Sequence, residues 1–155
     1  TPHWRFEATA AFSGITLAAT AGDFARAVFE GCSYEVATAL DAMRAAGAGV
    51  DRLHVFGGGA RSQLWMRILA AVCRLPVHVC REAETALRGA AMLAARGFFG
   101  SRRGAGLIAA LRSEVEHVVV DTAFCATYGP LMARYRRARD AYWAFDSTLN
   151  TEDMP

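Results

Sequence analysis

The sequence predicts an α/β domain in which a parallel or mixed sheet is flanked by helices. A short apolar run at residues 53–56 stops at three successive glycines, and apolar residues then recur with helical spacing over residues 64–72. A second apolar run follows at residues 77–79, and an alanine-rich stretch at residues 84–96 has the composition of a helix. Strands that alternate with helices in this way are typical of a parallel or mixed sheet.

A long helix is expected before the first strand. Its apolar residues are spaced so that most of them lie on one face at 3.6 residues per turn. Thr20 or Asp23 could cap its start, and the Gly-Ala-Gly stretch at residues 47–49 tolerates the left-handed turn that ends a helix. The residues expected on the packed face are Phe24, Ala27, Val28, Val36, Leu40 and Met43.

The C-terminal segment carries less information about the fold. Residues 98–105 contain two glycines and a polar run and are expected to form a surface loop. Residues 115–120 are rich in β-branched side chains, which favours an edge strand, and residues 128–145 have the pattern of a terminal helix. Residues 147–155 show no apolar periodicity, so the domain is expected to span residues 1–146 with a frayed tail behind it. The terminal helix is expected to turn Leu131, Tyr135, Tyr142 and Phe145 toward the core.

Length and charge exclude several classes of function. The chain has 155 residues, 54% of them hydrophobic, which suffices for one domain with a continuous core. No apolar stretch approaches the roughly 20 residues of a membrane-spanning helix, and a net charge of +2 creates no field that would attract nucleic acid. The chain starts at Thr1 without a signal peptide, so we expect a cytoplasmic piece of a longer protein, without a membrane or nucleic-acid partner. Four arginines crowd one segment and are expected to form a solvated helix face: Arg134, Arg136, Arg137 and Arg139.

The cysteines and histidines form no recognisable metal motif. No CxxC pair is present, and the four histidines are not spaced as ligands beside the cysteines. Buried free thiols are therefore expected rather than disulfides or a metal site. The cysteines are Cys32, Cys73, Cys80 and Cys125, and the histidines are His3, His54, His78 and His117.

The glycine triplet at Gly57, Gly58 and Gly59 is the most informative local feature. Residues without Cβ let the backbone approach a ligand closely, and the helix that follows offers N–H groups without intrahelical partners. This combination favours a phosphate or nucleotide site, and a plain tight turn is the alternative. The triplet is not a Walker loop, because no Gly-Lys-Ser or Gly-Lys-Thr follows, and Ser62 stands where the dinucleotide fingerprint has its third glycine.

Three segments resemble one protein family in the same order. Residues 57–65, Gly-Gly-Gly-Ala-Arg-Ser-Gln-Leu-Trp, are similar to the adenosine-binding turn of the FGGY carbohydrate kinases, which include xylulokinase, gluconokinase and glycerol kinase. Residues 10–30 fit the second signature pattern of that family position by position, and residues 86–94 are similar to its Gly-Ala-Ala helix. The chain therefore resembles the C-terminal, nucleotide-binding part of such a kinase.

The resemblance implies a ribonuclease-H-like (actin-like ATPase) fold and the ATP-dependent phosphorylation of a sugar or polyol hydroxyl. ATP and Mg²⁺ would be the cofactors, with no metal ligand identifiable in this segment. Gly58 and Gly59 would lie against the α-phosphate and ribose, and Ser62 would lie beside the adenine or cap a helix. Arg61 would contact the base or solvent, and Trp65 would belong to the core or stack on adenine. The cofactor-binding residues implied are Gly57, Gly58, Gly59, Ala60, Ser62 and Gln63.

No catalytic residue is assigned within the chain. Asp23 is expected in the first turn of a helix, and the glutamates Glu30, Glu82 and Glu84 on helix faces or in salt bridges. By the resemblance, the aspartate base and the Gly-Thr-Ser phosphate turn precede this segment. The segment alone is therefore expected to be inactive, and the sugar would bind through the N-terminal part.

Two alternative functions stay open, and the sequence departs from the family pattern at several positions. The chain could be a non-catalytic FGGY-like domain with a regulatory or scaffold role, or an unrelated α/β binding module. Self-association as a homodimer is a further hypothesis, because an isolated domain would expose its sheet edge. The family usually has other residues at Arg5, Thr9, Ala10, Arg67 and Ala71, with Gln and Asp often found at the last two.

Overall fold

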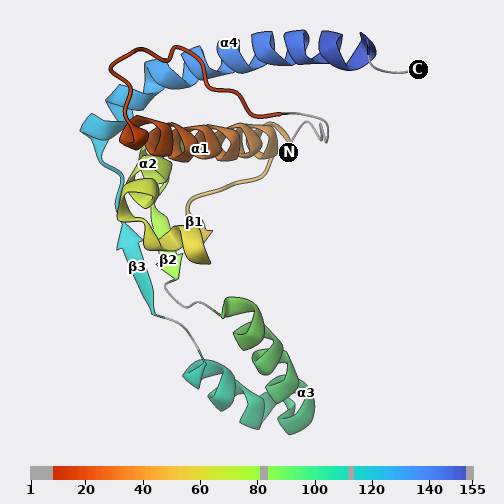
Figure 1. Ribbon diagram of the computed structural model, residues 1–155. Coiled ribbons are helices and arrows are strands. Elements are labelled where there is room, and N and C mark those ends of the chain that lie inside the picture. Colours follow the sequence, from red (N-terminus) through yellow and green to blue (C-terminus); the bar gives the residue numbers. More distant parts are fainter. Residues whose placement is uncertain (1–8, 81–83, 112–113, 153–155) are drawn as a thin grey trace.

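The computed structural model of the chain describes residues 9–80, 84–111 and 114–152 (Figure 1). Helices and strands alternate as the sequence predicts, and the glycine triplet leads into a 3₁₀ turn between the first strand and the next helix. In chain order the elements are α1 (Ala21–Ala45), β1 (Leu53–Val55), the 3₁₀ helix η1 (Gly58–Arg61), α2 (Gln63–Cys73), β2 (Val77–Cys80), α3 (Thr85–Ala110), β3 (Val115–Val118) and α4 (Thr122–Glu152).

The described strands form a small mixed sheet in the order β1-β2-β3. β1 pairs in parallel with β2, with Leu53 opposite Val77, and β3 pairs antiparallel with β2, with Val118 opposite the same Val77. The predicted mixed sheet and the β3 edge strand are both confirmed. Val77 and Val79 are buried on one face, and His78 between them must therefore point to the other face.

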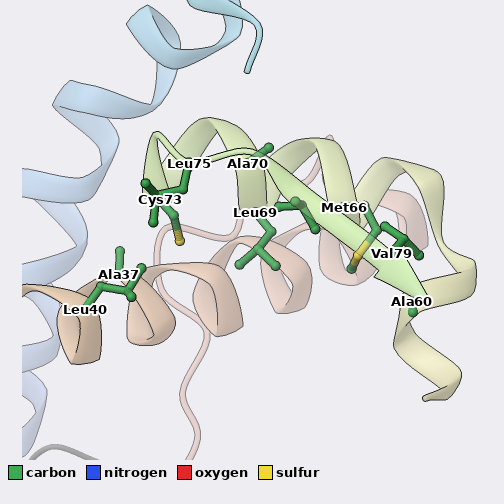
Figure 2. Close-up of a cluster of buried hydrophobic side chains, with 10 residues drawn as sticks. Ala37, Leu40, Ala60, Met66, Leu69, Ala70, Cys73, Leu75 and Val79 are labelled. Carbon is green, nitrogen blue, oxygen red and sulfur yellow. The ribbon is translucent and has the colours of Figure 1, made fainter. Parts of the chain in front are cut away.

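The core lies between the sheet and the helices on one of its faces. α2 packs on the sheet, and α1 and α4 pack on α2, while α3 lies apart from these layers (Figure 1). Figure 2 shows the side chains of this layer, to which α2 contributes Met66, Leu69, Ala70 and Cys73. The main cluster consists of Ala37, Leu40, Ala60, Met66, Leu69, Ala70, Cys73, Leu75, Val77 and Val79.

Helix α1 begins with a complete capping box. The side chain of Thr20 accepts a hydrogen bond from the backbone N–H of Asp23, and the backbone N–H of Thr20 donates to the Asp23 carboxylate at 2.8 Å. The expected face of α1 is only partly correct, because α2 and α4 cover the side of the helix that carries Tyr34, Ala37 and Leu40. Of the six residues expected to be packed only Leu40 is buried, and the other five are exposed instead: Phe24, Ala27, Val28, Val36 and Met43.

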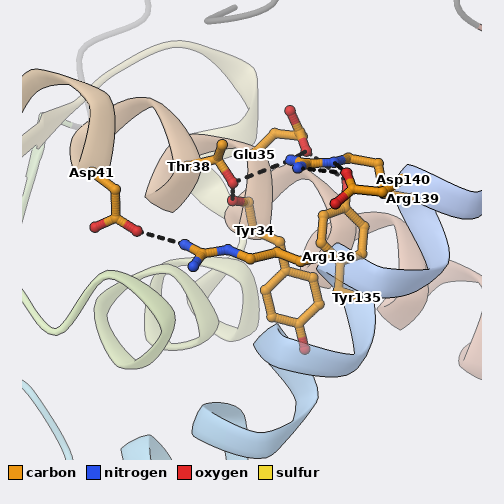
Figure 3. A network of polar contacts seen from close by, with 8 residues as sticks. All are labelled: Tyr34, Glu35, Thr38, Asp41, Tyr135, Arg136, Arg139 and Asp140. Carbon is orange, nitrogen blue, oxygen red and sulfur yellow. Dashed lines mark hydrogen bonds and ion pairs between the residues drawn. The ribbon is translucent and has the colours of Figure 1, made fainter. Parts of the chain in front are cut away.

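Ion pairs and aromatic rings join α1 to α4 (Figure 3). The Arg139 guanidinium lies 3.1 Å from the Glu35 carboxylate and over the Trp143 ring, and its side chain is only 11% exposed. Arg136 forms an ion pair with Asp41. The expectation of a solvated arginine face is therefore wrong for Arg139, whereas the Arg136 side chain keeps 43% exposure beside Asp41.

The C-terminal half is more helical than the sequence predicts. Residues 98–105 belong to α3, which bends at Gly100 where φ is 70°. The alanine-rich segments on both sides sustain the helix, so the expected loop is reduced to this bend. Helix α4 begins at Thr122, before the predicted start, and runs to Glu152, while the domain limit at residue 146 stays a prediction. Phe145 is exposed, contrary to expectation, and Leu131, Tyr135 and Tyr142 are half-buried.

The cysteines are free thiols in different surroundings. Cys73 is buried, Cys80 and Cys125 are half-buried, and Cys32 is exposed, which corrects the expectation of burial for that residue. Burial raises the pKa of the Cys73 thiol to about 12, so this thiol is unreactive near neutral pH. Among the described residues no helix is long and apolar enough to cross a membrane, and no cluster of side chains is arranged to hold a metal ion.

Candidate functional site

The glycine triplet forms a tight turn between β1 and α2. Gly57 has φ of 89°, in the left-handed region that favours glycine, and its carbonyl accepts a hydrogen bond from the N–H of Ala60 at 3.2 Å. The carbonyl of Gly59 accepts from the N–H of Ser62 at 3.1 Å, which closes η1 directly before α2. The predicted order of strand, glycine turn and helix is confirmed.

The side chain of Trp65 covers Gly59. A Cβ atom on Gly59 would lie 2.4 Å from Cζ3 of the indole, whereas a Cβ atom on Gly58 would meet nothing within 4 Å. The indole stacks on the Phe29 ring, with the ring centroids 5.1 Å apart and an angle of 13° between the planes. Of its two expected roles, the structure therefore supports the packing role for Trp65.

Ser62 caps α2. Its Oγ accepts a hydrogen bond from the backbone N–H of Trp65 at 3.2 Å, which confirms the capping alternative. Arg61 is exposed at the end of η1. A contact of either side chain with adenine stays a prediction.

The acidic residues of the signature segment have structural roles. Asp23 belongs to the capping box, and the Glu30 carboxylate pairs with Arg26 at 2.8 Å and accepts a hydrogen bond from the Tyr128 hydroxyl at 2.9 Å. Glu84 stands at the N-cap position of α3 without a side-chain capping bond, and Glu82 lies outside the described residues. These partners account for Asp23 and Glu30 without a catalytic role.

A pocket of about 380 Å³ lies at the start of α2, between that helix and the β2–β3 edge of the sheet. Two of the predicted cofactor-binding residues, Ala60 and Gln63, line it, whereas Gly57, Gly58, Gly59 and Ser62 are not among its lining residues. The complete lining is Ala60, Gln63, Met66, Arg67, Val79, Glu116, His117, Val118, Val119 and Asp121.

Sequence reasoning missed most of this lining. Met66 and Arg67 follow Gln63 by three and four residues, so helical spacing alone could have placed them on the same face of α2. The wall formed by residues 116–119 carries no comparable signal, because it depends on the antiparallel pairing of β3 with β2.

Both signs of charge are present in the pocket. The Arg67 guanidinium lies 4.0 Å from the Asp121 carboxylate and over the Phe124 ring, with 5.4 Å between the guanidinium carbon and the ring centroid. Asp121 also accepts a hydrogen bond from the backbone N–H of Phe124 at 3.1 Å, at the start of α4. Glu116 adds a second carboxylate to the lining.

One histidine from each strand lies in register across the sheet. His78 is opposite His54 on β1 and His117 on β3, with ring centroids 5.0 Å and 4.2 Å apart. Desolvation, followed by the proximity of His117 and His54, lowers the pKa of His78, and Arg52 acts in the same direction while Asp51 opposes it. Desolvation and the two neighbouring imidazoles therefore favour the neutral state of His78.

We expect this histidine row to make the fold less stable in acid. Because the folded-state pKa of His78 is below its ordinary value of about 6.5, the unfolded chain binds the proton first as the pH falls. Neutral His78 therefore stabilises the fold fully above a pH of about 6.5. This stabilisation is lost as the pH falls below that value and through the lowered folded-state pKa. The midpoint of thermal unfolding should change less between pH 7.5 and pH 5.5 for His78→Gln than for the unaltered chain. Equal differences would contradict the prediction.

Comparison with known proteins identifies the family. The model of the FGGY family of carbohydrate kinases, C-terminal domain, matches residues 1–98. The chain belongs to the FGGY family of carbohydrate kinases. It is 36% identical over 97 residues to a xylulose kinase of Staphylococcus epidermidis, covering 63% of this chain and 20% of the relative. It is 38% identical over 101 residues to a glycerol kinase of Rhodopirellula baltica, covering 63% and 19%. The chain thus spans about a fifth of the length of these curated relatives.

Solved FGGY kinases share the fold. The xylulose kinase from Rhodospirillum rubrum superimposes with a TM-score of 0.76 at 24% identity, covering 90% of this chain and 28% of that one. The gluconate kinase from Lactobacillus acidophilus gives a TM-score of 0.74 at 20% identity, covering 92% and 29%. The actin-like ATPase fold expected from the resemblance is confirmed, and the likeness extends beyond residue 98.

The structure accounts for two departures from the FGGY pattern. Ala71 is buried in a cluster with Tyr34, Ile68 and Tyr128, where an aspartate would be surrounded by apolar groups. Thr9 donates to the Asp146 carboxylate at 3.3 Å and forms a hydrogen bond with the hydroxyl of Tyr142 at 2.8 Å, so it links the N-terminal segment to α4. Arg5 lies outside the described residues.

Proposed function

We propose that this chain is the C-terminal nucleotide-binding part of an ATP-dependent kinase that phosphorylates a sugar or polyol hydroxyl. The observation that carries the proposal is the pocket beside η1 and the first turn of α2, lined by Ala60 and Gln63 within the family-matched segment. ATP would place its base in this pocket and its α-phosphate and ribose against Gly58 and Gly59.

The local chemistry supports a phosphate near the turn. The first N–H groups of a helix have no intrahelical partners, and their dipoles favour an anion there by about 0.3–1 kcal/mol. Space is open around Gly58, so a ligand can approach its backbone. This contribution orients a nucleotide, and the contacts of the pocket would provide the remaining affinity.

The described residues do not supply a Mg²⁺ site. The Asp121 carboxylate already contacts Arg67 and the N–H of Phe124, and no cluster in the described part of the chain is arranged to hold a metal. Mg²⁺ would therefore arrive with the ATP phosphates, and we assign it no ligand in this chain.

Binding of ATP should depend on Gly58. We expect the chain to bind a non-hydrolysable ATP analogue with Mg²⁺ in a calorimetric titration, and Gly58→Val to weaken binding at least tenfold, because its side chain would occupy the approach to the backbone. Gly31→Val is the matched control, since a Cβ atom at Gly31 also meets nothing within 4 Å, on α1 away from the glycine turn. Equal affinity of the unaltered chain and Gly58→Val would contradict a nucleotide at this turn.

We further propose that the segment does not catalyse by itself. Phosphoryl transfer to an alcohol needs a base within hydrogen-bond reach of the hydroxyl, and Asp23 and Glu30 are already held by structural partners. The base and the sugar site would come from the remainder of a longer kinase. A coupled assay for ADP release with a panel of sugars and polyols tests this, and turnover above background would contradict it.

A non-catalytic FGGY-like domain with a regulatory or scaffold role is the second candidate. It is favoured by Arg67 and Ala71, positions at which the family often has Gln and Asp. Replacing the matching segment of an active FGGY kinase with residues 1–146 separates the two candidates, because only a functional kinase segment would retain sugar phosphorylation.

A cytoplasmic location and a homodimer complete the proposal. The dimer would protect the unpaired edge of β1, which pairs only with β2 among the described strands. Light scattering that gives a monomer across a wide concentration range would exclude the dimer.

A further inference from the structure

We propose that Arg67 contacts the nucleobase, with one face of its guanidinium packed against the purine ring, and thereby sets the affinity of the base end of the pocket. This inference rests on the proposed nucleotide function and deepens it. Arg67 is not part of the glycine turn, so its contact with the base can be tested separately from nucleotide binding at the turn.

The position of Arg67 along α2 places it at the base end. Gln63 and Arg67 are one helical turn apart on the same face, so their Cα atoms are about 6 Å apart along the axis. The proposed phosphate contacts, Gly58 and Gly59, precede Ala60 and do not line the pocket. A nucleotide that runs from the glycine turn into the pocket therefore meets Gln63 before Arg67.

The guanidinium of Arg67 is positioned without being enclosed. The guanidinium carbon lies over the Phe124 ring, 5.4 Å from the ring centroid, and the Asp121 carboxylate lies at 4.0 Å. The side chain is 59% exposed and lines the pocket. Because the side chain is largely exposed and lines the pocket, its guanidinium is accessible to a ligand there, and guanidinium groups stack well on aromatic rings.

The charges around Arg67 favour a neutral ring over a phosphate. The carboxylates of Glu116 and Asp121 line the same part of the pocket and would repel a polyphosphate. Adenine carries no net charge, and its exocyclic amine can donate a hydrogen bond to a carboxylate. The phosphates are thus directed to the glycine turn, and the base to Arg67.

Paired titrations with adenosine and with Mg·ATP test this contact. We expect Arg67→Ala to weaken both ligands by a similar factor of about tenfold, within the range that base stacking contributes on alanine substitution. Arg67→Lys keeps the charge and can keep the pair with Asp121 but lacks the flat face, so it should also weaken both ligands. Arg137→Ala removes an exposed arginine of α4 that does not line the pocket and should bind like the unaltered chain.

Different results would overturn different statements. Unchanged affinity in Arg67→Ala, or a loss for ATP without a loss for adenosine, would exclude the base contact while leaving the proposed function intact. An Arg67→Lys variant that binds normally would show that charge, not the planar face, matters. If the unaltered chain binds neither ligand, the proposed function itself is wrong, and this inference falls with it. Thermal midpoints close to that of the unaltered chain are expected for the variants, because an exposed ion pair contributes little to stability.

Discussion

Replacing Gly59 with valine is expected to destabilise the chain by about 1–3 kcal/mol or more, the usual cost of adding atoms to a packed region. The first added carbon would lie 2.4 Å from Cζ3 of Trp65, and the indole cannot move freely because it stacks on Phe29. The free energy of unfolding, measured by urea denaturation, should therefore fall relative to the unaltered chain.

Gly58→Val is the matched control for this prediction. Its Cβ atom would meet nothing within 4 Å, so we expect a change in unfolding free energy of roughly 0.5 kcal/mol or less. Equal denaturation midpoints for Gly59→Val and the unaltered chain would show that Trp65 does not hold this position. The comparison also explains why Gly58 is the better residue for locating a nucleotide, since binding lost in Gly59→Val could reflect a disturbed Trp65.

Truncating Ile68 to alanine is expected to have the second large effect, a loss of about 2–5 kcal/mol in the free energy of unfolding. Ile68 is fully buried on α2 in a cluster with Tyr34, Ala71 and Tyr128, where α1, α2 and α4 meet. The lost carbon atoms would leave a cavity that the rings of Tyr34 and Tyr128 fill poorly. Urea denaturation monitored by tryptophan fluorescence and circular dichroism measures the effect.

Leu64→Ala provides the comparison on the same helix. Leu64 is 42% exposed, so the same type of truncation should cost less than about 1 kcal/mol. Similar losses at the two positions would mean that the three-helix junction is not the part of the core that stabilises α2.

Local chemistry in the sequence predicted the features that depend on neighbouring residues. The cap by Thr20, the cap by Ser62 and the left-handed turn at Gly47 each involve residues within three or four positions, where residue type and spacing determine geometry. The same holds for the strand-turn-helix order around the glycine triplet. The family followed from three such local segments and their order.

Local signals were misleading where two influences compete. Gly100 and the polar residues near it indicated a loop, yet the alanine-rich segments on both sides keep α3 helical and leave only a bend. Phe24 and Val28 have the spacing of a packed helix face but are exposed, because α2 and α4 pack on another side of α1. Helical spacing shows which residues share a face, and burial depends on what lies opposite.

The sequence by itself determined the alternation of strands and helices, the glycine turn and the kinase family, because these depend on short-range backbone preferences and on patterns that relatives share. Only the tertiary structure decided the walls of the pocket, the pairing of Arg139 with Glu35, and the row formed by His54, His78 and His117. These contacts join residues up to 104 positions apart, and they exist only after strand register and helix packing bring the residues together.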